Sequence, residues 1–571
     1  FAQELVIIPR GEVEDSNSLV LDGARQVSIL NVNEKYYAVV TALVDNGVQI
    51  IDVTDPENPV TKDSIIDDIA SELAGAYAVS TYTIEDKHYA IISGNQDNGI
   101  QILDITNPDT IIAKGIFNSG TQGISLQGLF DVATYSIGDK YYTAVISSSL
   151  NQFRIFDVTD PDTIMPKKHS NRPAIFDAYG IDTYSIGNSH YAVVVGNDRN
   201  GIHIREVTNP DEITYKHHIY FNGPNGDGVG GVASLESATD VDVYSVGGRY
   251  YAVVTSELGK VQIMDVTNPN RMIPKGMIEN DNTIKLGGAR AVSTFSIGDY
   301  HYAAIAAETD NAVQILNITN PNRITPVDNI SDNDTLELAG LRHIETYTIG
   351  SKSYAIAPAQ TDDGIQILEL NLIPTADAGK NKTVTIGRTV TLDGSASTDN
   401  GDLTYSWNQD SGEDVEISDD MIAMPTFDAP RKTDTLVFTL TVNDGDNSDT
   451  DTVTIKVIPK RDIKDMDETI VAVQITGPNE ITIAFNKELS TFINSYLNFT
   501  ISGEDTARNI TGIDGSPSKR GIISIDGEDV NAYLTILTFD GEPAPAGSTG
   551  SMYIQHADHY LKLATVTDAQ N

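Results

Sequence analysis

The chain has 571 residues, a formal net charge of −44 and no cysteine. Its length exceeds what one hydrophobic core supports, so about three domains are expected. The acidic charge repels nucleic acid and anionic membranes and favours cation binding. The lack of cysteine excludes disulfides and thiolate metal sites, and no apolar run is long enough to span a membrane.

One hairpin-like unit recurs along the first two thirds of the chain. In its first copy, residues 37–59, two apolar runs flank an Asp-Asn-Gly turn and are followed by a Thr-Asp-Pro stop. Asn-Gly allows the positive φ angles of a tight β-turn, so the unit predicts a hairpin. Further copies begin at Tyr89, Tyr142, Tyr191, Tyr251, Tyr302 and Tyr354.

The units recur with a period of about 50 residues, which is typical of β-propellers. Each period contains four strand signals, for example residues 76–84, 89–93, 100–105 and 111–117. Four antiparallel strands make one propeller blade. The sequence therefore predicts seven blades.

The two ends of this repeat region complement each other. The last unit has no fourth strand after Leu370, whereas residues 4–16 resemble the fourth strands of the other units. We expect residues 5–8 to pair with residues 364–370 and complete the seventh blade. Such closure joins the ends of the ring and removes exposed sheet edges.

The repeated phrase has a family resemblance. DNGIQILDITNP, residues 97–108, and its variants resemble the LVIVD repeat of secreted and surface proteins of archaea and bacteria. The resemblance covers residues 1–370. It implies a propeller and no particular activity.

Residues 374–459 differ in character from the repeats. The stretches LDGSAS (392–397), LTYSW (403–407), FDAP (427–430) and FTLTVND (438–444) resemble a PKD domain, an immunoglobulin-like sandwich of extracellular proteins. Trp407 is the only tryptophan, and we expect it in the small core of that sandwich.

The last part of the chain follows a charged linker, residues 460–468. It resembles the immunoglobulin-like modules of archaeal cell-surface proteins, those of ammonia-oxidising archaea among them. Its end, VTDAQN, resembles a phrase that separates successive modules in longer polypeptides. The predicted fold is therefore all-β: a seven-bladed β-propeller at 1–372, a PKD-like β-sandwich at 373–460 and an immunoglobulin-like β-sandwich at 469–571.

Two polar residues repeat with the blades, and repetition favours an architectural role. We expect the acidic residue that ends the third strand to cap the following turn, as at Asp52, Asp104, Asp157 and Asp265. We expect the glutamine inside that strand to tie neighbouring strands through its buried amide, as at Gln49, Gln101, Gln262, Gln314 and Gln366.

Positions that vary among the blades are better candidates for function. Two neighbouring positions at the start of the innermost strand are expected to ring one mouth of the channel. Arginine beside aromatic residues suits a sugar or a carboxylate ligand. The alternative is that each arginine pairs with a nearby Asp and fills the channel. The candidate ligand-binding residues are Arg25, Tyr77, Phe130, Tyr179, Arg290, Arg342, Asp131 and Asp240.

The acidic turns are candidates for Ca²⁺, which prefers oxygen ligands. The expected ligands in the PKD-like sandwich are Asp399, Asp402, Asp444 and Asp446; no organic cofactor is expected. Six sequons are typical of a secreted glycoprotein: Asn317, Asn329, Asn333, Asn381, Asn498 and Asn509. Residues 1–4, Phe-Ala-Gln-Glu, resemble the end of a signal peptide cleaved near Ala2.

Together these features predict a secreted, cell-surface protein with a structural or adhesive role, part of or attached to an archaeal surface layer. Its partners would be other surface proteins, copies of itself, or glycans. The alternative is a secreted carbohydrate-binding protein or glycan-active enzyme that uses the channel mouth. A hydrolase needs carboxylates that break the symmetry of the blades, and the candidates are Asp131, Asp182, Asp240 and Asp242. No catalytic residue is assigned.

Overall fold

The computed structural model describes residues 4–459, except 17, 69–70, 171–176, 197–200, 221–235 and 334, and beyond them the strands between 470 and 567. These residues are almost entirely strands and turns; the helical element among them is one 3₁₀ turn, Thr121–Gly123. The predicted all-β class is confirmed.

Seven four-stranded antiparallel sheets occupy the described residues of the repeat region. The second sheet contains β6 (Ala76–Ile84), β7 (Lys87–Gly94), β8 (Gly99–Asp104) and β9 (Ile112–Asn118), close to the four predicted strands. The others are β2 (Ala24–Val32), β3 (Lys35–Ala42), β4 (Gly47–Asp52), β5 (Val60–Ile66); β10 (Leu129–Ile137), β11 (Lys140–Ser147), β12 (Gln152–Asp157), β13 (Met165–Ser170); β14 (Ala178–Ile186), β15 (Ser189–Gly196), β16 (Gly201–Glu206), β17 (Thr214–Tyr220); β18 (Ala238–Val246), β19 (Arg249–Ser256), β20 (Lys260–Asp265), β21 (Ile273–Glu279); β22 (Ala289–Ile297), β23 (Tyr300–Ala307), β24 (Ala312–Asn317), β25 (Thr325–Ser331); and β26 (Glu345–Ile349), β27 (Lys352–Ala359), β28 (Gly364–Leu372) with β1 (Leu5–Glu14).

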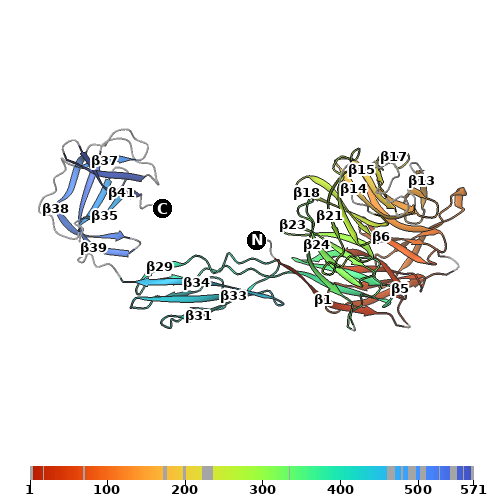
Figure 1. Cartoon of the computed structure of the whole chain (residues 1–571), viewed down its shortest axis with the longest axis horizontal. Helices are drawn as coiled ribbons and strands as arrows, with labels where there is room; N and C mark the ends of the chain where they lie inside the picture. The colour runs from red at the N-terminus through yellow and green to blue at the C-terminus, as the bar shows by residue number, and fades with distance from the viewer. Residues whose placement is uncertain are drawn as a thin grey trace.

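The innermost strands of consecutive sheets contact one another in series, from β2 through β6 to β22 and β26, and β26 contacts β2 again. Figure 1 shows the sheets gathered around a common centre. Both faces of each sheet are therefore covered by its neighbours.

This packing explains the continuous apolar runs of the repeat. In β4, Ile50 packs into a cluster shared with the second sheet, whereas Ile51 packs into one shared with the last sheet. Because successive side chains of a strand point to opposite faces, a strand covered on both faces must be apolar at every position. The turn after β3 then needs a left-handed residue, and Asn46 supplies it with φ 55°.

Tyrosines in the innermost strands link neighbouring sheets. The hydroxyl of Tyr184 donates to the carbonyl of Val266 (3.1 Å), and that of Tyr244 donates to Ile318 (3.0 Å). Each acceptor follows the third strand of the next sheet. These buried hydrogen bonds are directional, whereas the other contacts between neighbouring sheets are mainly apolar.

The N-terminal strand completes the last sheet, as predicted. β1 pairs antiparallel with β28, so that Leu5 lies opposite Leu372 and Glu14 opposite Gly364. The pairing extends beyond the predicted residues and contains an irregularity between Pro9 and Glu12. Residues from the two ends of the repeat region thus share one sheet.

The next six strands form two sheets with one core. The strands are β29 (Lys382–Thr385), β30 (Thr389–Thr391), β31 (Thr404–Ser411), β32 (Thr426–Asp428), β33 (Asp434–Asn443) and β34 (Ser448–Ile458), in the orders β29-β34-β33-β31 and β30-β32. Trp407 is 2% exposed within this core, as predicted, and its indole N–H donates to the carbonyl of Ile422 (3.2 Å).

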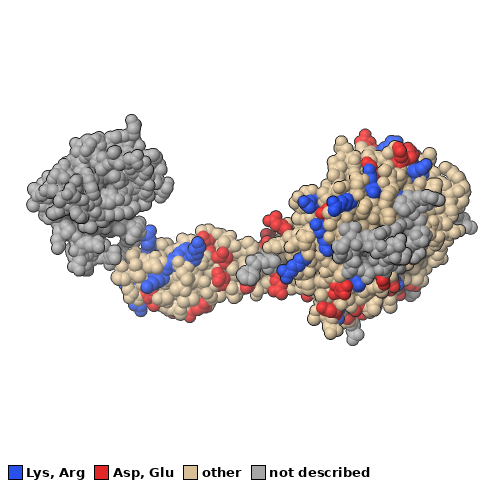
Figure 2. Space-filling view, turned by 45° about the horizontal axis from the view of Figure 1, so that its top comes forward, with Lys and Arg blue, Asp and Glu red and all other residues tan. Residues whose placement is uncertain are grey.

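A short polar neck joins this sandwich to the ring of sheets. Arg10 of β1 lies between Glu369 of β28 and Asp446 of the β33–β34 turn, with N–O distances of 2.8 and 2.6 Å. Beside it, the Asn371 side-chain amide donates to Asp444 Oδ2 (2.7 Å). Figure 2 shows acidic side chains around this neck, while both charge signs are scattered over the rest of the visible face.

Beyond the sandwich, seven strands form two further sheets, β35-β36-β39-β38 and β37-β40-β41. Two all-β parts therefore follow the ring, as Figure 1 shows. The strands are β35 (Ile470–Gly477), β36 (Glu480–Phe485), β37 (Leu497–Ile501), β38 (Ile510–Ile525), β39 (Glu528–Phe539), β40 (Thr549–His556) and β41 (His559–Thr567).

Deleting residues 1–16 should destabilise the ring strongly. The deletion removes β1 with its buried side chains Leu5, Ile7 and Val13, each worth about 1.5–3 kcal/mol, and exposes an unpaired edge on β28. We expect the melting temperature to fall by roughly 10 °C or more, measured by calorimetry. Deletion of residues 1–3 is the control, because it leaves β1 intact. An unchanged melt for the longer deletion would contradict the role of β1.

Candidate functional site

The side chains at the channel mouth are presented by irregularities in the innermost strands. In six sheets the pairing of the first two strands skips one residue, for example between Ala24 and Gln26. A β-bulge turns the extra residue away from the regular alternation and re-aims its side chain. The skipped residues are Arg25, Tyr77, Phe130, Tyr179, Thr239 and Arg290.

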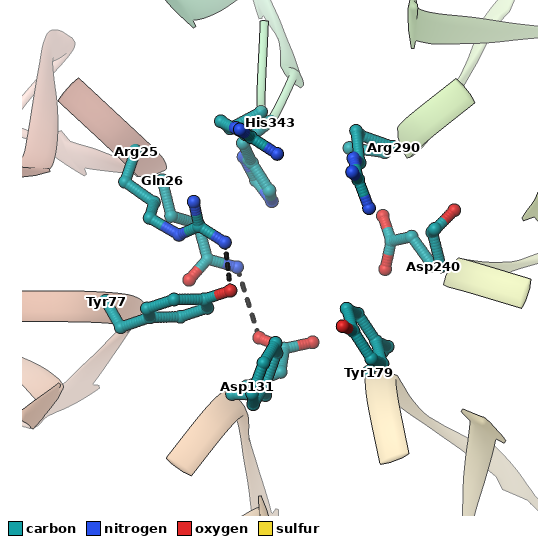
Figure 3. Close-up of a pocket in the computed structure, with 12 residues that line it drawn as sticks. Arg25, Gln26, Tyr77, Asp131, Tyr179, Asp240, Arg290 and His343 are labelled. Carbon is teal, nitrogen blue, oxygen red and sulfur yellow. Dashed lines mark hydrogen bonds between the residues drawn. The ribbon is translucent and has the colours of Figure 1, made fainter. Parts of the chain in front are cut away.

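These residues surround one pocket at the centre of the ring (Figure 3), with a cavity of about 70 Å³. All eight predicted ligand-binding residues lie around it, and their ligand remains a prediction. The complete lining is Arg25, Gln26, Tyr77, Phe130, Asp131, Tyr179, Thr239, Asp240, Arg290, Ala291, Arg342 and His343.

One side of the pocket is aromatic. The ring centroids of Tyr77 and Phe130 are 4.9 Å apart, and those of Phe130 and Tyr179 are 4.5 Å apart. The three rings come from three consecutive sheets and contact each other in tilted pairs. They form a continuous apolar arc with two hydroxyl groups.

The arginines have different partners. Glu308 accepts from Arg290 and forms an ion pair with Arg342 (2.6 Å), and Arg290 also contacts Glu257 (3.1 Å). The sequence-based alternative, in which each arginine pairs with a nearby Asp, is therefore wrong in its acceptor: the partners are glutamates. Within the described residues, these glutamates pair with Arg290 and Arg342 but not with Arg25.

Arg25 has no carboxylate partner among the described residues. Its guanidinium carbon lies 3.7 Å from the centroid of the Tyr77 ring, and it donates to the Tyr77 hydroxyl and to Gln360 Oε1 (3.2 Å). Burial lowers the pKa of Arg25, and the charges of Arg342 and Arg290 lower it further while Tyr77 opposes them. The mouth thus holds a cation that its own neighbours repel.

The floor of the pocket carries two carboxylates that brace adjacent sheets. Asp131 Oδ2 accepts the backbone N–H of Ile181 (3.0 Å), and Asp240 Oδ2 accepts that of Val292 (3.0 Å). Gln26 performs the same task for Val79 through its Oε1 (2.8 Å). Each innermost strand is a sheet edge, so these acceptors satisfy N–H groups that would otherwise lack partners.

The remaining hydrolase candidates have the same function one layer deeper. Asp182 Oδ2 accepts from Val243 N–H (2.9 Å), and Asp242 Oδ2 accepts from Thr294 N–H (2.6 Å). In other sheets a serine occupies this position: Ser80 Oγ accepts from Thr134 N–H (3.2 Å). The four carboxylates are therefore parts of the architecture, whatever further role they have.

Burial shifts the pKa values of the titratable side chains at the floor of the pocket and in the layer below it. It raises the pKa of Asp131 to about 6 and lowers that of His343 to about 3, where the nearby Arg25 charge adds to the effect. Burial and the neighbouring Asp242 raise the pKa of Glu345 to about 8 and that of Asp182 well above its usual range. At neutral pH the centre of the ring therefore carries less charge than the number of its acidic side chains suggests.

Sequence reasoning missed the residues that pair with the arginines of the mouth. Glu257, Glu308 and Gln360 each directly follow the second strand of their sheet, β19, β23 and β27. This position varies among the sheets as the mouth positions do, with Leu43, Asn95 and Ser148 in others. Comparing it across the repeats would have identified the partners of the arginines.

The repeated polar residues behave as predicted. Asp52 Oδ1 accepts the N–H of Thr54 (3.1 Å), and Asp104 does the same for Thr106 (3.0 Å). The Gln49 amide donates across to the carbonyls of Lys62 (3.1 Å) and Asp63 (3.2 Å). Both repeats are structural.

The predicted Ca²⁺ ligands are only partly together. Asp399 and Asp444 are close enough for Asp444 to raise the pKa of Asp399, after the larger effect of burial. Asp402 is exposed, and Asp446 instead pairs with Arg10. In the described part of the chain, no three His, Asp or Glu side chains gather in a group that holds a metal by themselves.

The sequons differ in exposure. The side chains of Asn333 and Asn381 are exposed, whereas Asn317 and Asn329 are half-buried. The Asn317 amide oxygen also caps a turn by accepting the N–H of Thr319 (3.0 Å). Asn498 and Asn509 lie outside the residues whose side chains the structure describes.

Comparison with known proteins identifies one module. Residues 378–457 match a family of PKD domains, which agrees with the predicted sandwich. PKD domains are typical of extracellular, adhesion-type proteins, and this part of the chain carries that indication. No curated protein matches the sequence.

Two of the solved structures to which the chain is similar show low sequence identity to it. Raptor from Chaetomium thermophilum aligns with 64% of this chain and 29% of its own length, at 10% identity and a TM-score of 0.43. A nucleoside hydrolase-related hypothetical protein from Saccharophagus degradans, associated with carbohydrate metabolism, aligns with 16% of this chain and 26% of its own length, at 23% identity and a TM-score of 0.15. Neither likeness supports an argument about function.

Within the described residues, no helix has the length and apolar character needed to cross a membrane.

Replacing Asp131 by Asn should change how stability depends on pH. The pKa of Asp131 rises from 3.8 in the unfolded chain to about 6 in the fold because of burial. Its contribution to stability is therefore full below pH 4 and is lost as the pH rises through 6. Asn cannot ionise and keeps an acceptor for Ile181, but its NH2 group replaces the oxygen that accepts from Gln26 and Val132, which costs stability at every pH. The stability of the variant relative to that of the wild type should therefore rise by about 1–3 kcal/mol as the pH goes from 4 to 7.

The measurement is denaturant unfolding of both proteins at several pH values. Asp299→Asn is the control, because it removes one exposed carboxylate. A stability difference that stays constant over this pH range would show that Asp131 is not held in its neutral form by burial.

Proposed function

We propose that the chain is an extracellular structural or adhesive surface protein, part of or attached to an archaeal surface layer. In this proposal residues 1–372 are a closed seven-bladed β-propeller of the LVIVD type. Residues 373–460 are a PKD-like stalk, and residues 469–571 are an immunoglobulin-like module. The PKD family match over residues 378–457 supports the extracellular setting.

The observation that carries the proposal is the neck. Arg10 contacts β28, the Glu57 loop and the sandwich turn at once, with a distance of 2.9 Å to Glu57 Oε1. Its side chain is only 12% exposed, so these ion pairs are stronger than those of a fully exposed arginine. A ring held on a stalk in this way presents a broad surface at a distance from its point of attachment.

The stalk also offers a route to association. β31 is an edge strand of the sandwich, with β33 on one side; on its other side one backbone N–H, that of Trp407, donates to the carbonyl of Asp420 (2.9 Å). An edge strand has unpaired backbone groups that can add a strand from another chain. The net charge of −44 opposes such contact until cations screen it. We therefore infer partners that are copies of this chain or other surface proteins.

The purified chain should associate when divalent cations are present. Light scattering and electron microscopy with chelator and then with millimolar Ca²⁺ should show a shift from single particles to larger assemblies. Addition of NaCl at the same ionic strength is the control for plain screening. Strictly single particles in all three conditions, together with turnover of a glycosidic substrate, would favour an enzyme instead.

A second candidate function is carbohydrate binding at the channel mouth. It is favoured by the aromatic arc and arginines, which occur on particular sheets only. The carboxylates Asp131, Asp182, Asp240 and Asp242 each accept a backbone N–H of the next sheet. That bracing role accounts for their presence without hydrolysis, so binding is the better proposal than turnover.

Ca²⁺ at the sandwich end of the neck is part of the proposal. Asp399 Oδ1 and Asn400 Oδ1 are buried there without a hydrogen-bond partner. Oxygen atoms of this kind fit a hard cation, and Asp399, Asn400 and Asp444 would hold it. The bound ion would offset the repulsion between the two carboxylates.

Calcium should therefore raise the thermal stability of the chain. Binding to the folded state alone adds about 2.7 kcal/mol when the ion is at 100 times its Kd. We expect a higher melting temperature with Ca²⁺ than with chelator, and a loss of this response in Asp399→Ala but not in Asp299→Ala. Identical melts with Ca²⁺ and chelator would rule out the site.

A further inference from the structure

Arg25 differs from the other two arginines of the mouth in its electrostatic environment. Arg290 and Arg342 share Glu308, whereas Arg25 contacts two neutral groups, the Tyr77 hydroxyl and Gln360. A buried cation beside like charges is stabilised by an anion. In this acidic chain, with 81 Asp and Glu against 37 Lys and Arg, a cation without a carboxylate partner is a distinctive feature.

The guanidinium of Arg25 is held ready for such an anion. It stacks on Tyr77 and is fixed by Gln360, contacts that use only part of its N–H donors. Arginine presents its donors as a planar fork that matches both oxygens of a carboxylate. The side chain is therefore already ordered in the unbound protein, so that ligand binding does not carry the entropic cost of ordering it.

The opposite part of the mouth suits a sugar ring. The Arg25 guanidinium lies over the ring of Tyr77, and the arc continues to Phe130 and Tyr179, whose rings offer a surface on which the C–H groups of a pyranose can pack. Figure 3 shows the carboxyl groups of Asp131 and Asp240 pointing into the same space. Each carboxylate accepts a backbone N–H of the next sheet, from Ile181 and Val292, and the second oxygen of Asp131 also accepts from the Gln26 amide (3.1 Å) and from its neighbour's N–H. A sugar hydroxyl can therefore reach these carboxylates only as a further donor to oxygens that already accept hydrogen bonds.

The size of the cavity restricts how such a ligand enters. A volume of about 70 Å³ holds only a few water molecules, each of which needs about 10–15 Å³ or more. A whole oligosaccharide does not fit inside, whereas a carboxylate and one edge of a terminal ring do. The pocket is thus shaped for the end of a chain.

We propose that the channel mouth binds the terminal residue of an acidic saccharide, a carboxylate-bearing pyranose such as a uronic acid, with the carboxylate on Arg25 and the ring on the aromatic arc. This inference rests on the proposal that the mouth is a carbohydrate site. It specifies the ligand as an acidic sugar and assigns the charged end of that sugar to one residue.

Calorimetric titration of the full chain tests it with four probes: glucuronate, glucose, acetate, and an oligosaccharide that ends in glucuronate. Glucuronate and the oligosaccharide should bind alike, because only the terminal residue enters. Glucose and acetate should each bind about tenfold or more weakly, since each lacks one half of the contacts.

Three variants locate the contacts. Arg25→Gln should weaken glucuronate binding by about 10- to 100-fold and leave glucose binding unchanged. Tyr179→Ala should weaken both sugars. Arg249→Gln is the matched control, because Arg249 is a surface arginine whose side chain is 61% exposed, and it should bind as the wild type does.

The outcomes separate this inference from the wider proposals. Equal binding of glucose and glucuronate would overturn the acidic ligand but leave carbohydrate binding standing, and failure of every sugar would overturn both. If Arg25→Gln does not fold, the four probes on the wild type decide the question alone. Cation-dependent association of the same variants reports on the surface role, which does not require the mouth.

Discussion

The innermost strand of every sheet in the ring has one edge without a strand partner, and the N–H groups on that edge need acceptors. Side chains of the preceding sheet provide them: Gln26, Ser80, Asp131 and Asp240 each bond to a strand of the next sheet. A buried N–H without a partner costs about 1–3 kcal/mol. The lumen is therefore polar because the architecture requires acceptors there, before any ligand is considered.

That requirement leaves the identity of each acceptor free. Serine, glutamine and aspartate all meet it, so the chain can place carboxylates on some sheets without loss of structure. The bulges add a second freedom, because the skipped residue points into the mouth and takes no part in the pairing. A symmetric scaffold thereby carries an asymmetric pocket, with arginines on one side and aromatic rings on the other.

Much of the fold was predictable because its determinants are local. The turn before β4, the apolar run of β3 and the proline that closes each unit all lie within one repeat, and repetition made the strand pattern unambiguous. The pairing of β1 with β28 was predictable by counting strands. The side chains of the mouth were also found, because they vary where the scaffold does not.

The partners of these side chains were not predictable in the same way. Whether Arg25 meets a carboxylate depends on which sheet has glutamate after its second strand, and the bulge decides the direction of each side chain. Asp446 was assigned to a cation site, but the fold brings it to Arg10, 436 residues earlier in sequence. Contacts of this kind arise only after the sheets are assembled.

The pairing of Leu5 with Leu372 also orders events during synthesis. The first strand of the ring to leave the ribosome belongs to its last sheet, so it must wait until almost the whole ring has been made. Bringing such distant segments together costs little entropy beyond that of a shorter loop, about 0.6 kcal/mol for each doubling of length. The delay, however, leaves an apolar strand and one face each of the first and sixth sheets uncovered while the rest of the ring is translated, the condition under which nascent chains aggregate. A ring built in this way gains from being kept unfolded until its last strand is available.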